Sequence, residues 1–165
     1  MLLLDYRLKY FMTASPEFER GIAEFNQQQF YACHDTLEAI WIDAPEMDKR
    51  FYQGILQVAV GCYHLSNDNL RGAIILLGEA VRRLCDYQPD YQRVDVELLL
   101  QQAVQLLHAL QQLQPEQAKD FFAYLQHERL RSAVSSRSPV ESPADNSQSL
   151  ADLAAGCQLP YIQRI

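Results

Sequence analysis

Residues 51–66, FYQGILQVAVGCYHLS, contain no Asp, Glu, Lys or Arg. A helix that is apolar nearly all round is typical of the centre of a core. We therefore expect a buried central helix from about Asp48 to Ser66. Gly54 and Gly61 each cost a helix roughly 0.8–1 kcal/mol relative to Ala, so they indicate a close approach of a neighbouring backbone. The run is too short and too rich in polar amides to cross a bilayer.

Apolar residues at the 3.6-residue period predict further helices on both sides of this one. Ser15-Pro16-Glu17 is typical of a helix start, and Asn69 is a good N-cap after the turn that precedes it. Residues before Pro45 avoid helical angles, so a helix ends there. No alternating strand pattern competes. The sequence predicts an all-α fold with about six helices in three antiparallel hairpins, a tetratricopeptide-like helical bundle.

The composition changes near the C-terminus. We divide the chain into a helical domain over 1–131, a Ser/Pro linker over 132–149 and a short apolar peptide over 150–165. The linker has almost nothing to bury, so it is expected to be disordered. The apolar peptide needs somewhere to bury its side chains. It could dock on its own domain, dock on a partner or hang free.

Charge and cysteine content exclude several classes of protein. The formal net charge is -7 and the sequence pI is about 5.0, which disfavours nucleic acid and anionic membranes as partners. The four cysteines form no C-x-x-C pair and no zinc-finger spacing. We interpret them as reduced thiols in a cytoplasmic protein.

One set of residues, spaced about one helical turn apart, could form a metal-binding or catalytic site. His34, Glu38 and Trp41 stand at i, i+4 and i+7, which places them on one face of a helix, with Asp35 beside them. An imidazole and a carboxylate one turn apart can chelate a divalent metal or act as an acid–base pair. A metal needs more than two ligands, so the rest would come from elsewhere in the fold.

The central helix offers candidate partners. Gln53, Gln57 and His64 share one face of it, and buried polar groups must find hydrogen bonds or cost about 1–3 kcal/mol each. We expect this row to meet His34 and Glu38 across the hairpin, forming a buried polar cluster.

Several motifs between Gly21 and Leu84 occur in an order that resembles a known family. They are Phe25-Asn26, Phe30-Tyr31-x-x-His34-x-x-x-Glu38-x-x-Trp41, Tyr52-Gln53-Gly54-Ile55-x-Gln57-x-Ala59, Tyr63-His64, Asn69 and Gly72-Ala73. The pattern is similar to domain of unknown function family three hundred and nine. The resemblance implies a helical fold and a motif, His34, Glu38 and Trp41, suggested to bind metal. Gln53, Gly54 and Gln57 would form the accompanying motif, and Asp35 stands where many members have the longer Glu.

Three functions compete on these observations. The first is an interaction or scaffold module, with a protein partner or a homodimer, in which the polar cluster only fixes helix packing. The second is a metal-binding protein or metal-dependent enzyme that uses His34 and Glu38, with His64 as a further candidate ligand. The third is a small-ligand protein with its pocket beside Trp41.

Overall fold

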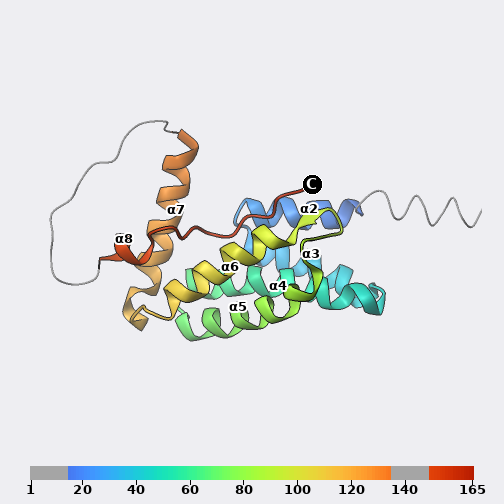
Figure 1. Ribbon diagram of the computed structural model, residues 1–165, viewed down its shortest axis with the longest axis horizontal. Helices are drawn as coiled ribbons and strands as arrows, with labels where there is room; N and C mark the ends of the chain where they lie inside the picture. The colour runs from blue at the N-terminus through green and yellow to red at the C-terminus, as the bar shows by residue number, and fades with distance from the viewer. Residues whose placement is uncertain (1–14, 135–148) are drawn as a thin grey trace, which may run out of the picture.

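The computed structural model describes residues 15–134 and 149–165, with side chains given for 15–132 and 149–165. Its helices are α2 (Pro16–Asn26), α3 (Phe30–Asp43), α4 (Glu46–Ser66), α5 (Leu70–Leu84), α6 (Val96–Leu110), α7 (Ala118–Val134) and α8 (Leu150–Leu153). Short 3-10 turns cover Cys85–Tyr87 and Pro115–Gln117. One small antiparallel hairpin joins β1 (Asp90–Tyr91) to β2 (Val94–Asp95). The predicted all-α class is confirmed (Figure 1).

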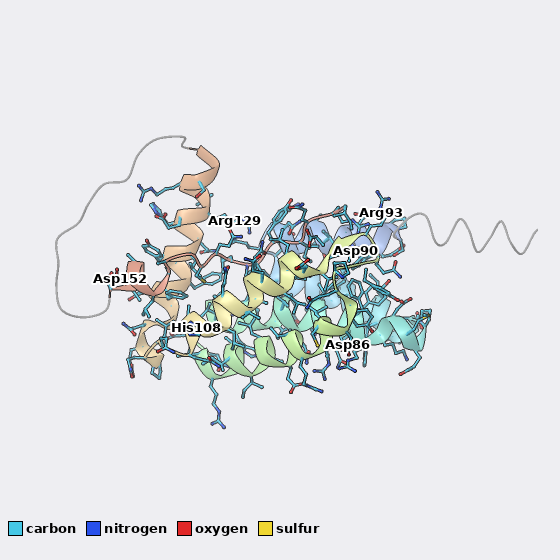
Figure 2. All side chains as sticks on the ribbon, viewed as in Figure 1. Asp86, Asp90, Arg93, His108, Arg129 and Asp152 are labelled. Atoms are coloured by element: carbon cyan, nitrogen blue, oxygen red, sulfur yellow. The ribbon has the colours of Figure 1, made fainter. Side chains whose placement is uncertain are left out.

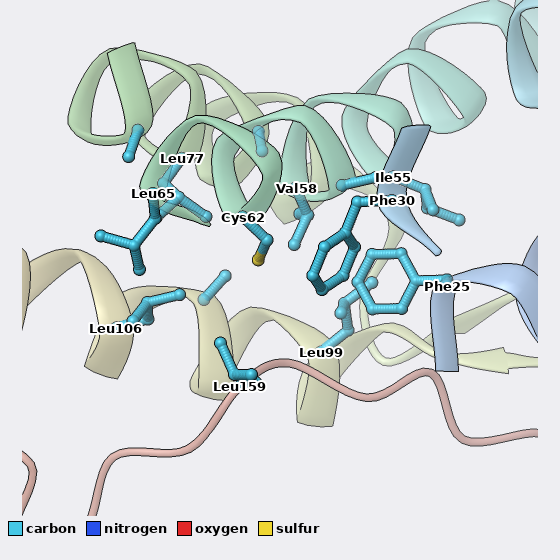
Figure 3. Close-up of a cluster of buried hydrophobic side chains, with 14 of the residues drawn as sticks. Phe25, Phe30, Ile55, Val58, Cys62, Leu65, Leu77, Leu99, Leu106 and Leu159 are labelled. Carbon is cyan, nitrogen blue, oxygen red and sulfur yellow. The ribbon is translucent and has the colours of Figure 1, made fainter. Parts of the chain in front are cut away.

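The uncharged run lies at the centre, as predicted. Helix α4 packs between α3 and α5, and Ile55, Val58 and Cys62 are fully buried. Figure 3 shows these α4 side chains pointing toward Phe25 and Leu99, which come from helices far apart in sequence. None of the described helices is long and apolar enough to span a membrane.

The two glycines of α4 lie against α5. A Cβ placed on Gly54 would lie 2.7 Å from the side chain of Leu84, and one on Gly61 would lie 3.0 Å from Leu77. The neighbour is α5, but side chains rather than its backbone fill the space beside Gly54; only at Gly61 does a backbone atom come near, the Ala73 carbonyl oxygen at 3.5 Å from the added Cβ.

The capping residues predicted from the sequence do mark the starts of α2 and α5. The Ser15 hydroxyl accepts a hydrogen bond from the backbone N–H of Phe18 at 3.1 Å, with Pro16 at the first helical position. The Asn69 carbonyl oxygen Oδ1 accepts one from the N–H of Gly72 at 2.9 Å. Each side chain satisfies a donor that the first turn of a helix leaves free.

Helices α6 and α7, the third pair along the described chain, do not pack against each other as the first two pairs do. Helices α2 and α3 pack together, as do α4 and α5, whereas α7 packs on α4 and α8. Figure 1 shows α7 standing across the end of α6. The hairpin over residues 90–95 was not anticipated, because its turn residues Gln92 and Arg93 have positive φ without being Gly or Asn.

The C-terminal segment docks on its own domain. Helix α7 continues to Val134, so the predicted linker is wrong for residues 132–134, and the remainder up to 148 lies outside the described residues. The segment resumes at Ser149, the N-cap of α8. Leu159 and Ile162 are then buried, at 2% and 1% exposure. The sequence left open whether the apolar peptide docks on its own domain, docks on a partner or hangs free, and in the structure it docks on its own domain.

Candidate functional site

The polar residues of the motif on helix α3 lie toward the surface, whereas Thr36 of the same helix is buried. The His34 side chain is 31% exposed, Glu38 is exposed, and Trp41 is half-buried against the core. Within the described residues, Glu38 has no hydrogen bond or ion pair. The motif therefore keeps its shared helical face, but that face does not lie in the interior.

His34 is oriented by its neighbour in sequence. Its Nδ1 lies 3.1 Å from Oδ1 of Asp35. An ionised carboxylate can only accept, so in the neutral form of the ring Nδ1 carries the proton and Nε2 keeps its lone pair. This arrangement is also the one that orients metal-binding and general-base histidines.

Rings from α3 and α4 form a row on the surface, with His34 at one end and His64 at the other. The Tyr31 ring stacks on His34 with centroids 6.3 Å apart, and it lies 5.6 Å from the Tyr63 ring. Tyr63 in turn lies 6.5 Å from His64. We call these four residues the Tyr/His cluster. Tyr31 is 61% exposed and Tyr63 is 37% exposed, so the cluster faces solvent.

The tautomer of the neutral His64 ring follows from its hydrogen-bond partner. Asn69 uses Oδ1 to accept from Gly72, so its Nδ2 donates to Nδ1 of His64 at 2.9 Å. The proton of the neutral imidazole is then on Nε2, and neither nitrogen offers a lone pair to a cation. Across residues 15–132 and 149–165, no three His, Cys, Asp or Glu side chains are grouped so that they could hold a metal ion. The geometry does not support the set His34, Glu38 and His64 as metal ligands.

The glutamine row finds its partner in α5. Oε1 of Gln53 accepts from Nε of Arg83 at 3.0 Å, and Arg83 also pairs with Glu79. The expected contact of Gln53 with the His34 face is therefore wrong. Gln57 is 8% exposed, and its buried Oε1 has no hydrogen-bond partner in the described part of the chain. Of the predicted polar cluster, only Gln57 is buried.

A cavity does lie beside Trp41. It measures about 310 Å³ and opens where α3, the start of α4 and the end of α5 meet. Its lining residues are Trp41, Glu46, Lys49, Arg50, Gln53, Arg82 and Arg83. Basic side chains outnumber acidic ones in this wall, although each of them has an acidic partner: Arg50 pairs with Asp86 at 3.1 Å, Lys49 with Glu46 at 3.9 Å, and Arg82 and Arg83 both pair with Glu79. The motif is thus divided, with Trp41 at this cavity and His34 in the Tyr/His cluster.

Two larger cavities had no signal in the sequence. One of about 680 Å³ lies between α6, α7 and the C-terminal segment, and one of about 550 Å³ lies between α2, α3 and the start of α4. Their walls come from segments remote in the chain. Tyr31 and Tyr63 do stand within the quoted motifs, but helical periodicity alone does not show that they meet.

Fold and site together define an all-α protein of packed helical hairpins with a surface Tyr/His cluster on its second and third described helices. Residues 18–76 match the model of the family described as Domain of unknown function (DUF309), which agrees with the resemblance seen in the motifs. The chain is also 35% identical over 65 residues to Uncharacterized protein YpuF of Bacillus subtilis (strain 168). That match covers 38% of this chain and 37% of the relative, so the chain spans well under half of the relative's length. No solved structure matches significantly.

Proposed function

We propose that this domain is a protein-interaction module that binds its partner through the Tyr/His cluster. One observation carries the proposal: Tyr31, His34 and Tyr63 expose adjoining rings on two helices that are packed against each other. Tyrosine is enriched at the energetic centres of interfaces, because it buries a large ring and still offers a hydroxyl.

The scaffold beneath the cluster favours tight recognition. Cys33 and Leu37 on α3 are fully buried beneath the exposed face, as is Cys62 on α4. Side chains on such rigid helices lose little further entropy on binding, so more of the contact energy is retained as affinity. An interaction module needs no nucleophile or ligand set, which suits a site in which the contacts of the His34 imidazole, among the described residues, are Asp35 and the ring of Tyr31.

A site-specific photocrosslinker tests the proposal. Benzoylphenylalanine placed at Tyr31 in the full chain, within cells that make this protein, should give one defined adduct, identified by mass spectrometry. The matched control is Ile75 on α5, which is 54% exposed on another face. The adduct at position 31 should disappear with Tyr63→Ala and stay absent at position 75. The same products at both positions, or none at position 31, would refute the proposal.

A second candidate function is binding of a small anion in the cavity beside Trp41. The supporting observation is the set of basic side chains, including Lys49 and Arg82, beside the single aromatic ring of Trp41. Trp41 is the sole tryptophan, so its fluorescence reports the cavity directly. Titration with pyrophosphate or citrate should give a saturable change that Lys49→Gln weakens several-fold. Unchanged emission with both probes would remove this candidate.

The metal hypothesis can be tested separately from both. His34 and Glu38 supply two ligands at most, and His64 is engaged by Asn69. We expect zinc or manganese to shift the melting temperature of the wild type and of His34→Ala equally. A shift seen only in the wild type would restore metal binding as the function of the motif.

A further inference from the structure

The C-terminal segment lies on the domain as an extended peptide. Residues 159–165 run beside α6 and reach α2 without forming a helix of their own (Figure 1). Figure 2 shows Arg129 and Arg93 near the two ends of this path. The guanidinium of Arg129 lies 5.6 Å from the centre of the Tyr161 ring, and the backbone oxygen of Arg93 accepts from the N–H of Ile165 at 3.1 Å.

Two amide side chains bind the backbone of this segment. Asn26 donates from Nδ2 to the carbonyl oxygen of Ile162 at 2.9 Å and accepts from the N–H of the same residue at 2.8 Å. Gln102 on α6 accepts from the N–H of Tyr161 at 2.7 Å. An amide side chain that pairs with both the N–H and the carbonyl oxygen of one residue recognises extended backbone whatever the side chain of that residue, and Gln102 is itself buried.

The small hairpin continues this backbone pairing. The N–H of Asp95 donates to the carbonyl oxygen of Gln163 at 3.0 Å, and Val94 forms an antiparallel bridge with Arg164. The segment therefore adds a short strand to the edge of β2. Addition of a strand to an exposed edge is a common way for proteins to bind extended peptides.

Side chains give the groove its specificity. Leu159 and Ile162 are buried three residues apart, while Arg164 pairs with Glu19 and lies over the Phe18 ring at 5.7 Å. Backbone pairing, two apolar anchors and the basic residue Arg164 make a complete recognition pattern. We define the docking groove by Asn26, Val94 and Gln102, together with Phe18 and Glu19 near the start of α2.

We infer that this groove and segment 159–165 form a docking pair that also operates between two copies of the chain. All contacts of the pair are non-covalent, and residues 135–148 are the only link between Val134 and Ser149. A stretch of that length can span at most about 50 Å. The segment of a second copy presents identical chemistry, so each copy can fill the groove of the other. Docking within one chain competes, because a short tether gives an effective concentration in the millimolar range.

Complementary variants of the full chain remove that competition. In Asn26→Ala/Gln102→Ala the groove is impaired and the segment is intact. In Ile162→Asp the segment is impaired and the groove is intact. Each variant alone should remain monomeric by light scattering, whereas an equimolar mixture should give a one-to-one complex, since it contains one good groove and one good segment.

A control variant and a second measurement make the result decisive. The control mixture combines Ile162→Asp with His127→Ala, an exposed change on α7, in place of the groove variant. In the His127→Ala protein the segment already fills the groove of the same chain. The complex in this mixture should therefore be at least tenfold weaker. A fluorescent peptide of residues 157–165 should bind Ile162→Asp saturably, and at least tenfold more weakly once Asn26→Ala is added. If Ile162→Asp loses its helical circular dichroism, Ile162→Ala takes its place with the same expected outcomes. Folded variants that stay monomeric in the mixture at about 200 μM would overturn the inference.

Discussion

Substitution of Gly54 by Ala probes the contact between α4 and α5. In an open helix this change stabilises by roughly 0.8–1 kcal/mol, because alanine loses less backbone entropy than glycine. Here the new Cβ would lie 2.7 Å from both Cγ and Cδ2 of Leu84, which is fully buried and has no room to move toward solvent. Overpacking of this kind costs typically 1–3 kcal/mol. We expect the overpacking cost to exceed the gain in helix propensity, so that Gly54→Ala lowers the free energy of unfolding by about 1–2 kcal/mol.

Gly78 is the matched control within the same helix pair. It lies inside α5, and a Cβ placed there would have no atom within 4 Å. Gly78→Ala should therefore raise the free energy of unfolding by about 0.8–1 kcal/mol. The two variants have the same chemistry and opposite expected signs.

Urea unfolding at 25 °C, followed by circular dichroism and by the emission of Trp41, measures both changes. Coincident transitions by the two probes would support a two-state analysis. In a Leu84→Ala background, which itself costs about 2–5 kcal/mol, Gly54→Ala should become stabilising because its clash partner is gone. Equal stabilisation by Gly54→Ala and Gly78→Ala in the wild-type background would refute the reasoning.

Three further predictions concern single side chains. Gln57→Met replaces an amide whose buried Oε1 has no hydrogen-bond partner in the described part of the chain by a group of similar shape. It should leave the unfolding free energy unchanged or raise it by about 1 kcal/mol; a loss of that size would show that Oε1 has a partner. Burial raises the pKa of the Cys33 thiol to about 12, so a disulfide reagent should modify exposed Cys85 at once and Cys33 only after unfolding; equal rates would contradict this burial. Hydrogen bonds from two arginines, that of Arg82 foremost, lower the pKa of the Glu79 carboxyl to about 2. The interaction of Glu79 with the two arginines therefore stabilises the fold above the ordinary carboxyl pKa and is lost as the pH falls from about 4.5 toward 2. Glu79→Gln should make the free energy of unfolding depend less on pH in that window. An unchanged pH dependence would argue against this interaction.

The division of the motif between two sites explains the limits of prediction from sequence. Spacing placed His34 and Trp41 correctly on one face of α3, because helical geometry fixes which residues share a face. Spacing could not show which neighbour each one meets. The structure groups His34 with Tyr31 and Tyr63, and it places Trp41 at a cavity whose walls include residues of α5.

The sequence by itself determined the all-α class, the buried central helix and the caps at Ser15 and Asn69, because these depend on periodicity and on contacts within one turn. Only the tertiary structure decided that Gln53 binds Arg83, thirty positions further along the chain, and that Asn26 holds Ile162. Such pairs depend on the rotation of each helix about its axis and on where an extended segment crosses it. Those quantities come from the packing of the whole core, and no local pattern of residues encodes them.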